Sequence, residues 1–187
     1  LWYTNGRNCL EDSMKQPYLE CGKIINLHGF RGAVKMESYC DTPGVLAHLG
    51  TLWLREKDGY RPVKVRHASV FRQFVIAELE GVESEDAANR LRGVTVYAAR
   101  EDLPLKAGAF FIADLIGTPV RHADTGESIG TLTDVTTGAT ADLYTVTLAG
   151  GGQALIPAVP AFVVRTDPDD AIYIRPIPGL LGEEADK

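Results

Sequence analysis

Short segments in which apolar and polar residues alternate recur along the chain, and this is the pattern of a β-strand with one buried face. In segment 33–38, valine and methionine alternate with lysine and glutamate, and segment 143–148 shows a similar alternation. Each such segment is short and is followed by glycine, proline or another turn former. Strands are predicted over residues 18–25, 33–38, 52–54, 63–66, 74–79, 94–97, 116–120, 128–135, 143–148, 154–157 and 171–175.

One helix stands out among the predicted strands. Ser84 can cap its N-terminus, acidic residues occupy its first turn, and Gly93 follows its last turn. Asp58-Gly59 predicts a tight hairpin, and Gly150–Gly152 predicts another. The pattern therefore predicts an all-β dominated protein of two small β-barrels, with one short helix near residues 84–92.

A segment without periodicity, rich in charge and containing Pro104 and Gly108, separates the two predicted barrels. The residues at either end of the chain show no strand pattern, and we expect them to be disordered. The predicted organisation is a disordered extension over 1–16, a first β-barrel over 17–100, a linker over 101–108, a second β-barrel over 109–181 and a disordered tail over 182–187.

Charge distinguishes the two halves. Residues 1–100 carry 14 Lys and Arg against 12 Asp and Glu, a balance of +2, whereas residues 101–187 carry 5 against 13, a balance of −8. A strongly acidic half is a poor ligand for nucleic-acid phosphates but can attract a basic protein. Acidic surfaces also simply keep domains in solution, and charge alone favours that second interpretation.

Motifs that announce an enzyme are absent from the sequence. There is no phosphate-binding loop, dinucleotide-binding fingerprint or hydrolase nucleophile elbow. The four histidines lack helical pairing and the three cysteines lack metal-binding spacing, so we expect reduced thiols and no metal. No run of about 18 apolar residues predicts a membrane span. An enzyme whose site is assembled only in space stays an alternative.

Several segments, in order, resemble the RimM family of 16S rRNA-processing proteins. They begin with the strand-turn-strand Gly22–Lys35 and continue with the helix and strand at Ala87–Tyr97. Each one is a weak signal, whereas the ordered set covers nearly all of residues 18–181. The remaining segments of the set are 100–104, 110–117, 130–135, 155–160 and 178–181.

The resemblance implies a translation-factor-like barrel followed by a PRC-type barrel. It also implies binding to the small ribosomal subunit, through small-subunit ribosomal protein nineteen, during assembly of the subunit head and processing of 16S rRNA. No cofactor, metal or catalytic residue is implied, and we expect a cytoplasmic monomer that acts as an assembly chaperone without contacting membranes. The alternatives are an enzyme that acts on rRNA and a barrel adaptor for a protein unrelated to ribosomes.

The resemblance also places a protein-binding site at Phe110, Phe111, Asp114 and Leu115. The family usually carries Tyr-Tyr where this chain has Phe110-Phe111, a pair associated with subunit binding; phenylalanine keeps the ring but loses the hydroxyl. If the pair lies in a strand, one ring enters the core and the other faces a partner. In the alternative, both rings seal the junction between the domains, and Asp114 only braces the same loop.

Four residues of the first strand-turn-strand could form a basic edge that touches RNA phosphates: Lys23, His28, Arg31 and Lys35. The alternative is a solvated hairpin face, which the sequence alone favours. Gly29 and Gly32 are expected to serve the turn geometry, and Trp53 to lie in the core.

Overall fold

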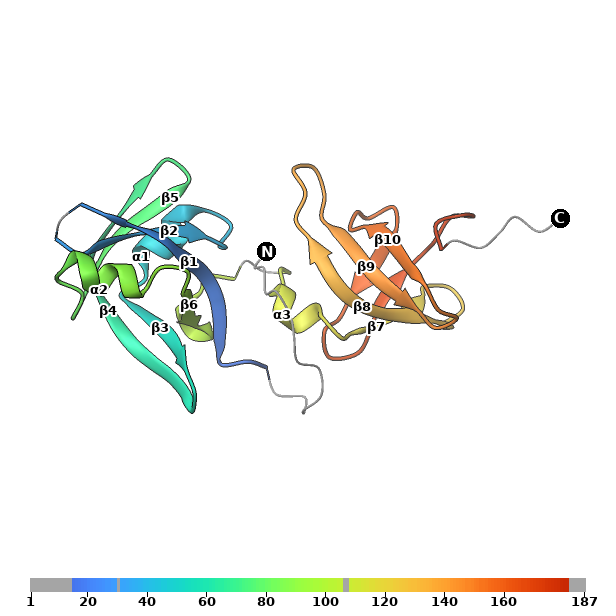
Figure 1. Cartoon of the computed structure of the whole chain (residues 1–187). Coiled ribbons are helices and arrows are strands. Elements are labelled where there is room, and N and C mark those ends of the chain that lie inside the picture. Colours follow the sequence, from blue (N-terminus) through green and yellow to red (C-terminus); the bar gives the residue numbers. More distant parts are fainter. Residues whose placement is uncertain (1–14, 30, 106–107, 182–187) are drawn as a thin grey trace. The chain divides into compact units, whose positions relative to one another are not determined.

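The structure is a computed structural model, and it describes residues 15–29, 31–105 and 108–181 (Figure 1). The predicted disordered tail and all but the last two residues of the predicted extension lie outside these ranges. The described chain divides into two compact units, and the boundary in sequence lies between Ala109 and Phe110. The part of the chain that is described contains no helix long and apolar enough to cross a membrane.

The first unit is a closed barrel in which every strand pairs with its neighbours in antiparallel fashion, in the order β1-β2-β5-β4-β3-β6. This confirms the prediction of a small closed barrel. The alternating side of each strand supplies the core, which explains why periodicity located these strands. They are β1 (Tyr18–His28), β2 (Ala33–Ser38), β3 (Thr51–Glu56), β4 (Gly59–Phe71), β5 (Phe74–Leu79) and β6 (Thr95–Ala99).

Irregularities in β1 allow the barrel to close. The register of β1 shifts once against β2 and once against β6, and such bulges add local twist and bend. Gly22 lies between these shifts, where a Cβ atom would stand 2.5 Å from the carbonyl oxygen of Glu37. Only glycine therefore permits β2 to approach β1 this closely.

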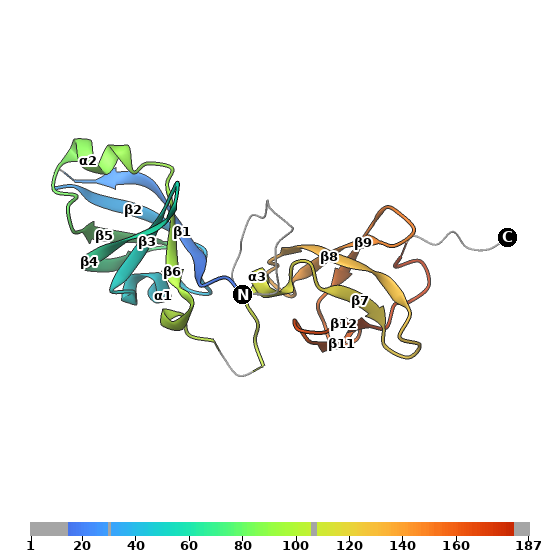
Figure 2. The same cartoon turned by 90° about the horizontal axis from the view of Figure 1, so that it is seen from below.

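The predicted helix is present as α2 (Glu85–Arg90). The backbone N–H of Ala87 donates a hydrogen bond to the Ser84 hydroxyl oxygen at 3.2 Å, which confirms the predicted cap. Two short helical segments of this unit were not predicted: α1 (Pro43–His48) and the 3-10 turn η1 (Arg100–Asp102). α2 packs against β1 and β2, whereas α1 packs mainly against β4 and β5 (Figure 2).

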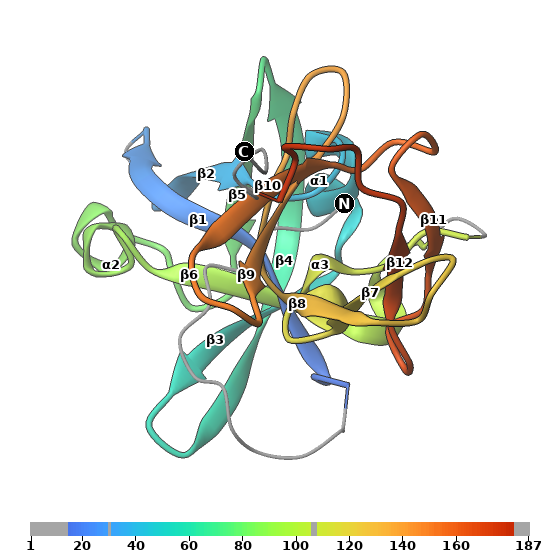
Figure 3. The same cartoon turned by 90° about the vertical axis from the view of Figure 1, so that its right-hand side faces the viewer.

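The second unit is built on one six-stranded sheet in the order β10-β9-β8-β7-β12-β11. Its pairs are antiparallel except β7 and β12, which run parallel, so that the strand nearest the C-terminus lies between β7 and β11 (Figure 3). The strands are β7 (Pro119–His122), β8 (Ser128–Thr136), β9 (Leu143–Leu148), β10 (Gln153–Pro157), β11 (Val163–Thr166) and β12 (Ile172–Ile174).

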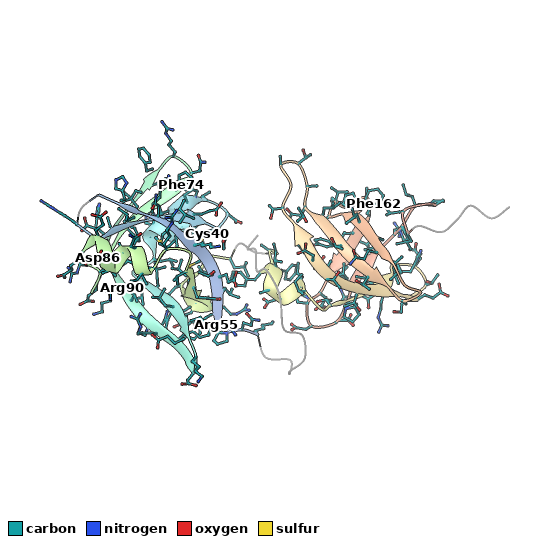
Figure 4. All side chains as sticks on the ribbon, viewed as in Figure 1. Cys40, Arg55, Phe74, Asp86, Arg90 and Phe162 are labelled. Atoms are coloured by element: carbon teal, nitrogen blue, oxygen red, sulfur yellow. The ribbon has the colours of Figure 1, made fainter. Side chains whose placement is uncertain are left out.

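The sequence placed a strand over 116–120, and the start of that prediction is wrong. The chain first forms the short helix α3 (Ile112–Leu115), and β7 begins only at Pro119. The buried side chains of α3 and β7 belong to one hydrophobic core, which also contains side chains of β8, β9, β10 and β12. Phe162 packs against this core from the segment before β11 (Figure 4).

Candidate functional site

The segment expected to bind a protein opens the second unit, and it is not a strand. Phe111 is the N-cap of α3 and is 3% exposed, while Phe110 is half-buried and packs against the core of the second unit. Leu115, at 1% exposed, is part of that core. The two aromatic rings therefore differ in burial where the chain enters a helix directly after Phe111, and not because a strand alternates.

Asp114 lies in the single turn of α3. Its backbone N–H donates to the carbonyl oxygen of Phe111 at 2.9 Å, and its own carbonyl accepts from the buried Thr118 hydroxyl at 3.4 Å. These bonds tie the helix to the start of β7. Asp114 is half-buried, and these bonds involve only its backbone atoms.

The four basic candidates of the first unit lie on β1, on β2 and in the turn between them. Lys23 lies opposite Glu37 in the register of β1 and β2, so a carboxylate accompanies it. His28 and Arg31 are exposed at the far end of the same hairpin. The Lys35 ammonium nitrogen stands 3.8 Å from the centroid of the Phe74 ring, a cation–π contact across to β5.

Gly32 has a backbone requirement of its own. Its φ is +81°, and a Cβ atom would stand 2.6 Å from the carbonyl oxygen of Val82 and 2.8 Å from the Ser84 nitrogen. The turn after β1 therefore passes directly against the chain that leads into α2. This agrees with a conformational role for the glycine.

The acidic half of the chain is acidic within its folded part. Residues 110–181 contain eight Asp and Glu, three Arg and no Lys, a balance of −5 with histidine neutral. Arg175 makes two hydrogen bonds to Asp124, at 2.7 and 2.9 Å, and this contact lowers the pKa of the Asp124 carboxyl. Arg165 likewise contacts Asp167 at 2.7 Å. Two of the three cations thus already lie against carboxylates, and the field outside the domain is negative.

An aromatic cluster of the first unit was not foreseen. Tyr18 stacks at 4.6 Å from Trp53 and at 4.5 Å from Tyr60, and Tyr60 meets Tyr97 edge-on at 5.0 Å between ring centroids. Desolvation by this packing raises the pKa of Tyr60 and of Tyr97. Trp53 was expected in the core, but it is half-buried in this cluster. Its indole N–H is the one buried side-chain polar group without a hydrogen-bond partner that the described ranges contain.

The thiols within the described ranges are reduced, as the sequence predicted for the cysteines, while Cys9 lies outside those ranges. The Cys40 thiol donates to the carbonyl oxygen of Cys21 at 3.4 Å, and burial raises the pKa of Cys40 to about 12. Both thiols are therefore protonated at neutral pH, which makes them poor nucleophiles. Across residues 15–29, 31–105 and 108–181, no group of three or more His, Cys, Asp or Glu is placed to hold a metal ion.

Comparison with known proteins gives matches over both units. The family model described as the RimM N-terminal domain matches residues 19–103, and the one described as the PRC-barrel domain matches residues 107–181. The protein named ribosome maturation factor RimM of Gloeobacter violaceus is 34% identical over 91% of this chain and 96% of its own length. The protein of the same name from Symbiobacterium thermophilum is 36% identical over 87% of this chain and 94% of its own length.

Two solved structures are also similar. A putative 16S ribosomal RNA processing protein RimM from Pseudomonas aeruginosa has 20% identity and a TM-score of 0.44, over 84% of this chain and 96% of that one. The N-terminal domain of RimM from Thermus thermophilus has 22% identity and a TM-score of 0.40, over 48% of this chain and 98% of that one. The family models and the relatives more than 30% identical confirm the resemblance found in the sequence, and the chain belongs to the RimM family.

Proposed function

We propose that this protein is a ribosome maturation factor that binds the small ribosomal subunit through small-subunit ribosomal protein nineteen and assists head assembly and 16S rRNA processing. It acts by binding rather than by catalysis, in the cytoplasm and as a monomer. The observation that carries the proposal is the match of both domains, end to end, to proteins named ribosome maturation factor RimM.

The charge of the second domain supports a basic protein as its partner. Residues 110–181 contain eight Asp and Glu against three Arg, and Arg165 and Arg175 already form ion pairs, so the domain keeps a net negative charge. Complementary potentials accelerate encounter and disfavour acidic competitors. Ribosomal proteins are basic because they bind RNA phosphates, so they fit such a field.

Phe110 is the residue of the expected site that can touch a partner most directly. It is half-buried, whereas Phe111 and Leu115 are buried. In the proposed site, the two buried side chains hold α3 in place, and Phe110 with the neighbouring Asp114 forms the contact. A partly exposed aromatic ring fixed by a packed helix is typical of an interface anchor.

Binding of this kind can promote assembly without chemistry. A factor that binds one conformer of a ribosomal protein or of nearby RNA raises the population of that conformer. Release follows when contacts made in the mature subunit compete for the same surface.

The test is calorimetric titration of the full chain with purified small-subunit ribosomal protein nineteen, at about 50 mM and about 300 mM salt. We expect binding that weakens with salt and that Phe110→Ala lowers by about tenfold or more. Leu155→Ala is the matched control, since it removes an exposed apolar side chain (54% exposed) elsewhere in the same domain. Unchanged folding of both variants is checked by thermal unfolding.

Absence of binding by the unmodified chain would refute this partner assignment. Co-sedimentation with immature small subunits then separates the remaining readings. An adaptor unrelated to ribosomes would remain in the supernatant, whereas a factor that contacts only rRNA would sediment with the subunits.

A further inference from the structure

The hairpin between β4 and β5 ends in exposed aromatic and apolar side chains. Phe71 is 52% exposed and Val70 is 48% exposed, and they are the last two residues of β4, next to the turn. The register places Phe71 directly opposite Phe74, whose side chain is half-buried, and Figure 4 labels Phe74. Exposed aromatic residues at the end of a projecting hairpin are uncommon unless they contact a partner.

The turn itself is held in an unfavourable conformation. Arg72 and Gln73 connect the paired phenylalanines, and Arg72 has a φ of +57°. Among the described residues it is the one non-glycine with a positive φ. Glycine or asparagine ordinarily occupies such a position, and a strained residue retained at an exposed tip points to a use for its side chain.

Cations accompany the two rings. The Arg72 guanidinium stands 5.7 Å from the centroid of Phe71, and the Lys35 ammonium stands 3.8 Å from the centroid of Phe74. Within residues 15–29, 31–105 and 108–181, neither cation forms an ion pair. Both charges are therefore available to an anion that approaches the rings.

The charged residues of the surrounding strand segment are all basic. Residues 59–77 contain four Lys and Arg and no Asp or Glu. Two of these cations, Arg61 and Arg66, pair with Glu56 and Glu83, away from the turn. The nearest carboxylate in the register is Glu37, which lies opposite Phe74 on β2.

We propose that this hairpin tip, defined as Lys35, Phe71, Arg72 and Phe74, binds an unpaired segment of RNA. A base stacks on the exposed ring of Phe71, and the adjoining phosphates contact Arg72 and Lys35. Unpaired RNA fits better than a duplex, because the bases of an A-form helix are stacked inside and cannot reach an aromatic ring. The inference rests on the proposed function in taking ribosomal RNA as the ligand, and it assigns the contact to a part of the barrel different from His28 and Arg31.

The experiment measures fluorescence anisotropy of a labelled single-stranded RNA of about ten nucleotides, with a duplex of the same sequence alongside. The full chain is compared with Phe71→Ala and with Arg72→Gly, which removes the side chain but suits the positive φ of the turn. Arg90→Ala in α2 is the control for loss of one exposed cation from the same domain. A polyglutamate peptide serves as the competing anionic probe.

We expect the single strand to bind more tightly than the duplex, and each tip variant to weaken it by about tenfold, the range expected for one stacked base. Arg90→Ala should stay within about twofold. Equal binding by the tip variants and the unmodified chain would overturn the inference. So would polyglutamate binding with the same dependence on Phe71 and Arg72, because the tip would then be a site for acidic proteins.

The same variants, titrated with small-subunit ribosomal protein nineteen, separate this inference from the proposed function. If that protein binds but the tip variants bind RNA normally, the tip assignment fails alone. If RNA binding needs the tip but that protein does not bind, the partner assignment fails alone.

Discussion

Replacing Arg72 by glycine should leave the stability of the first domain nearly unchanged, although removing a side chain usually destabilises. An L-residue in the left-handed region costs about 1–2 kcal/mol, and φ of +57° places Arg72 there. Glycine removes that cost but loses about 0.4–1 kcal/mol through greater freedom of the unfolded chain. Loss of the cation–π contact with Phe71 at 5.7 Å removes about 0.5 kcal/mol more. The net change in the free energy of unfolding is then between about −0.5 and +1.1 kcal/mol.

The neighbouring residue provides the comparison. Gln73 lies in the same turn without a positive φ, so Gln73→Gly brings only the entropic loss, about 0.5–1 kcal/mol of destabilisation. The entropic loss is common to both variants, so urea unfolding, analysed by linear extrapolation, should place Arg72→Gly above Gln73→Gly by about 0.5–1.5 kcal/mol. Equal destabilisation by the two would refute the claim that Arg72 is strained, and with it the argument that strain marks a functional tip.

Three further outcomes follow from contacts described above. Gly32→Ala should destabilise the first domain by about 3 kcal/mol or more in the same assay, because strain and a backbone clash add, whereas Gly29→Ala, with φ +72° and open space, should cost about 1 kcal/mol. The pKa of the Asp124 carboxyl, followed by NMR, should lie below its ordinary range and return to that range in Arg175→Gln. The contribution of this carboxyl to stability is present at neutral pH and is lost as pH falls through the lowered pKa. Identical titration in both proteins would contradict the ion pair. Cys40, whose pKa is about 12, should resist alkylation at pH 8 in the folded chain and react in urea, as judged by peptide mass spectrometry, and rapid reaction in the folded chain would contradict its burial.

The alternation of apolar and polar residues predicted the strands that have one buried face and one face exposed to solvent. The predicted limits of β2, β5 and β9 are those observed, because inward and outward residues alternate along most of their length. α2 was also predictable, since Ser84, the acidic first turn and Gly93 are local signals. The short helix α3 lacks such signals, and α1 has only Thr42 and Pro43 at its start. Neither has a side-chain cap, and tertiary packing must hold segments this short.

The candidate sites depended on contacts between distant segments, which no local pattern contains. The turn at Arg72 carries no glycine or asparagine, so no local signal predicted that β4 ends there or that Phe71 is exposed. Likewise, Asp124 and Arg175 are 51 residues apart and meet only because β12 inserts beside β7. Phe110 was singled out by resemblance, and its half-buried state depends on the helix that follows it.

The placement of β12 has a consequence for synthesis on the ribosome. β7 is made first in this domain, yet its parallel neighbour is one of the last segments to be translated. β11 pairs only with β12, so a nascent chain that stops before Ile172 lacks three residues of strand, but β11 then has no partner and β7 is paired on one side only. The barrel of the first domain needs no residue beyond Ala99 to complete its strand pairing. Domains fold as units from the N-terminus during synthesis. A premature stop in the second half should therefore yield a folded first domain joined to an unfinished sheet, a product that cellular proteases can recognise by its open edges.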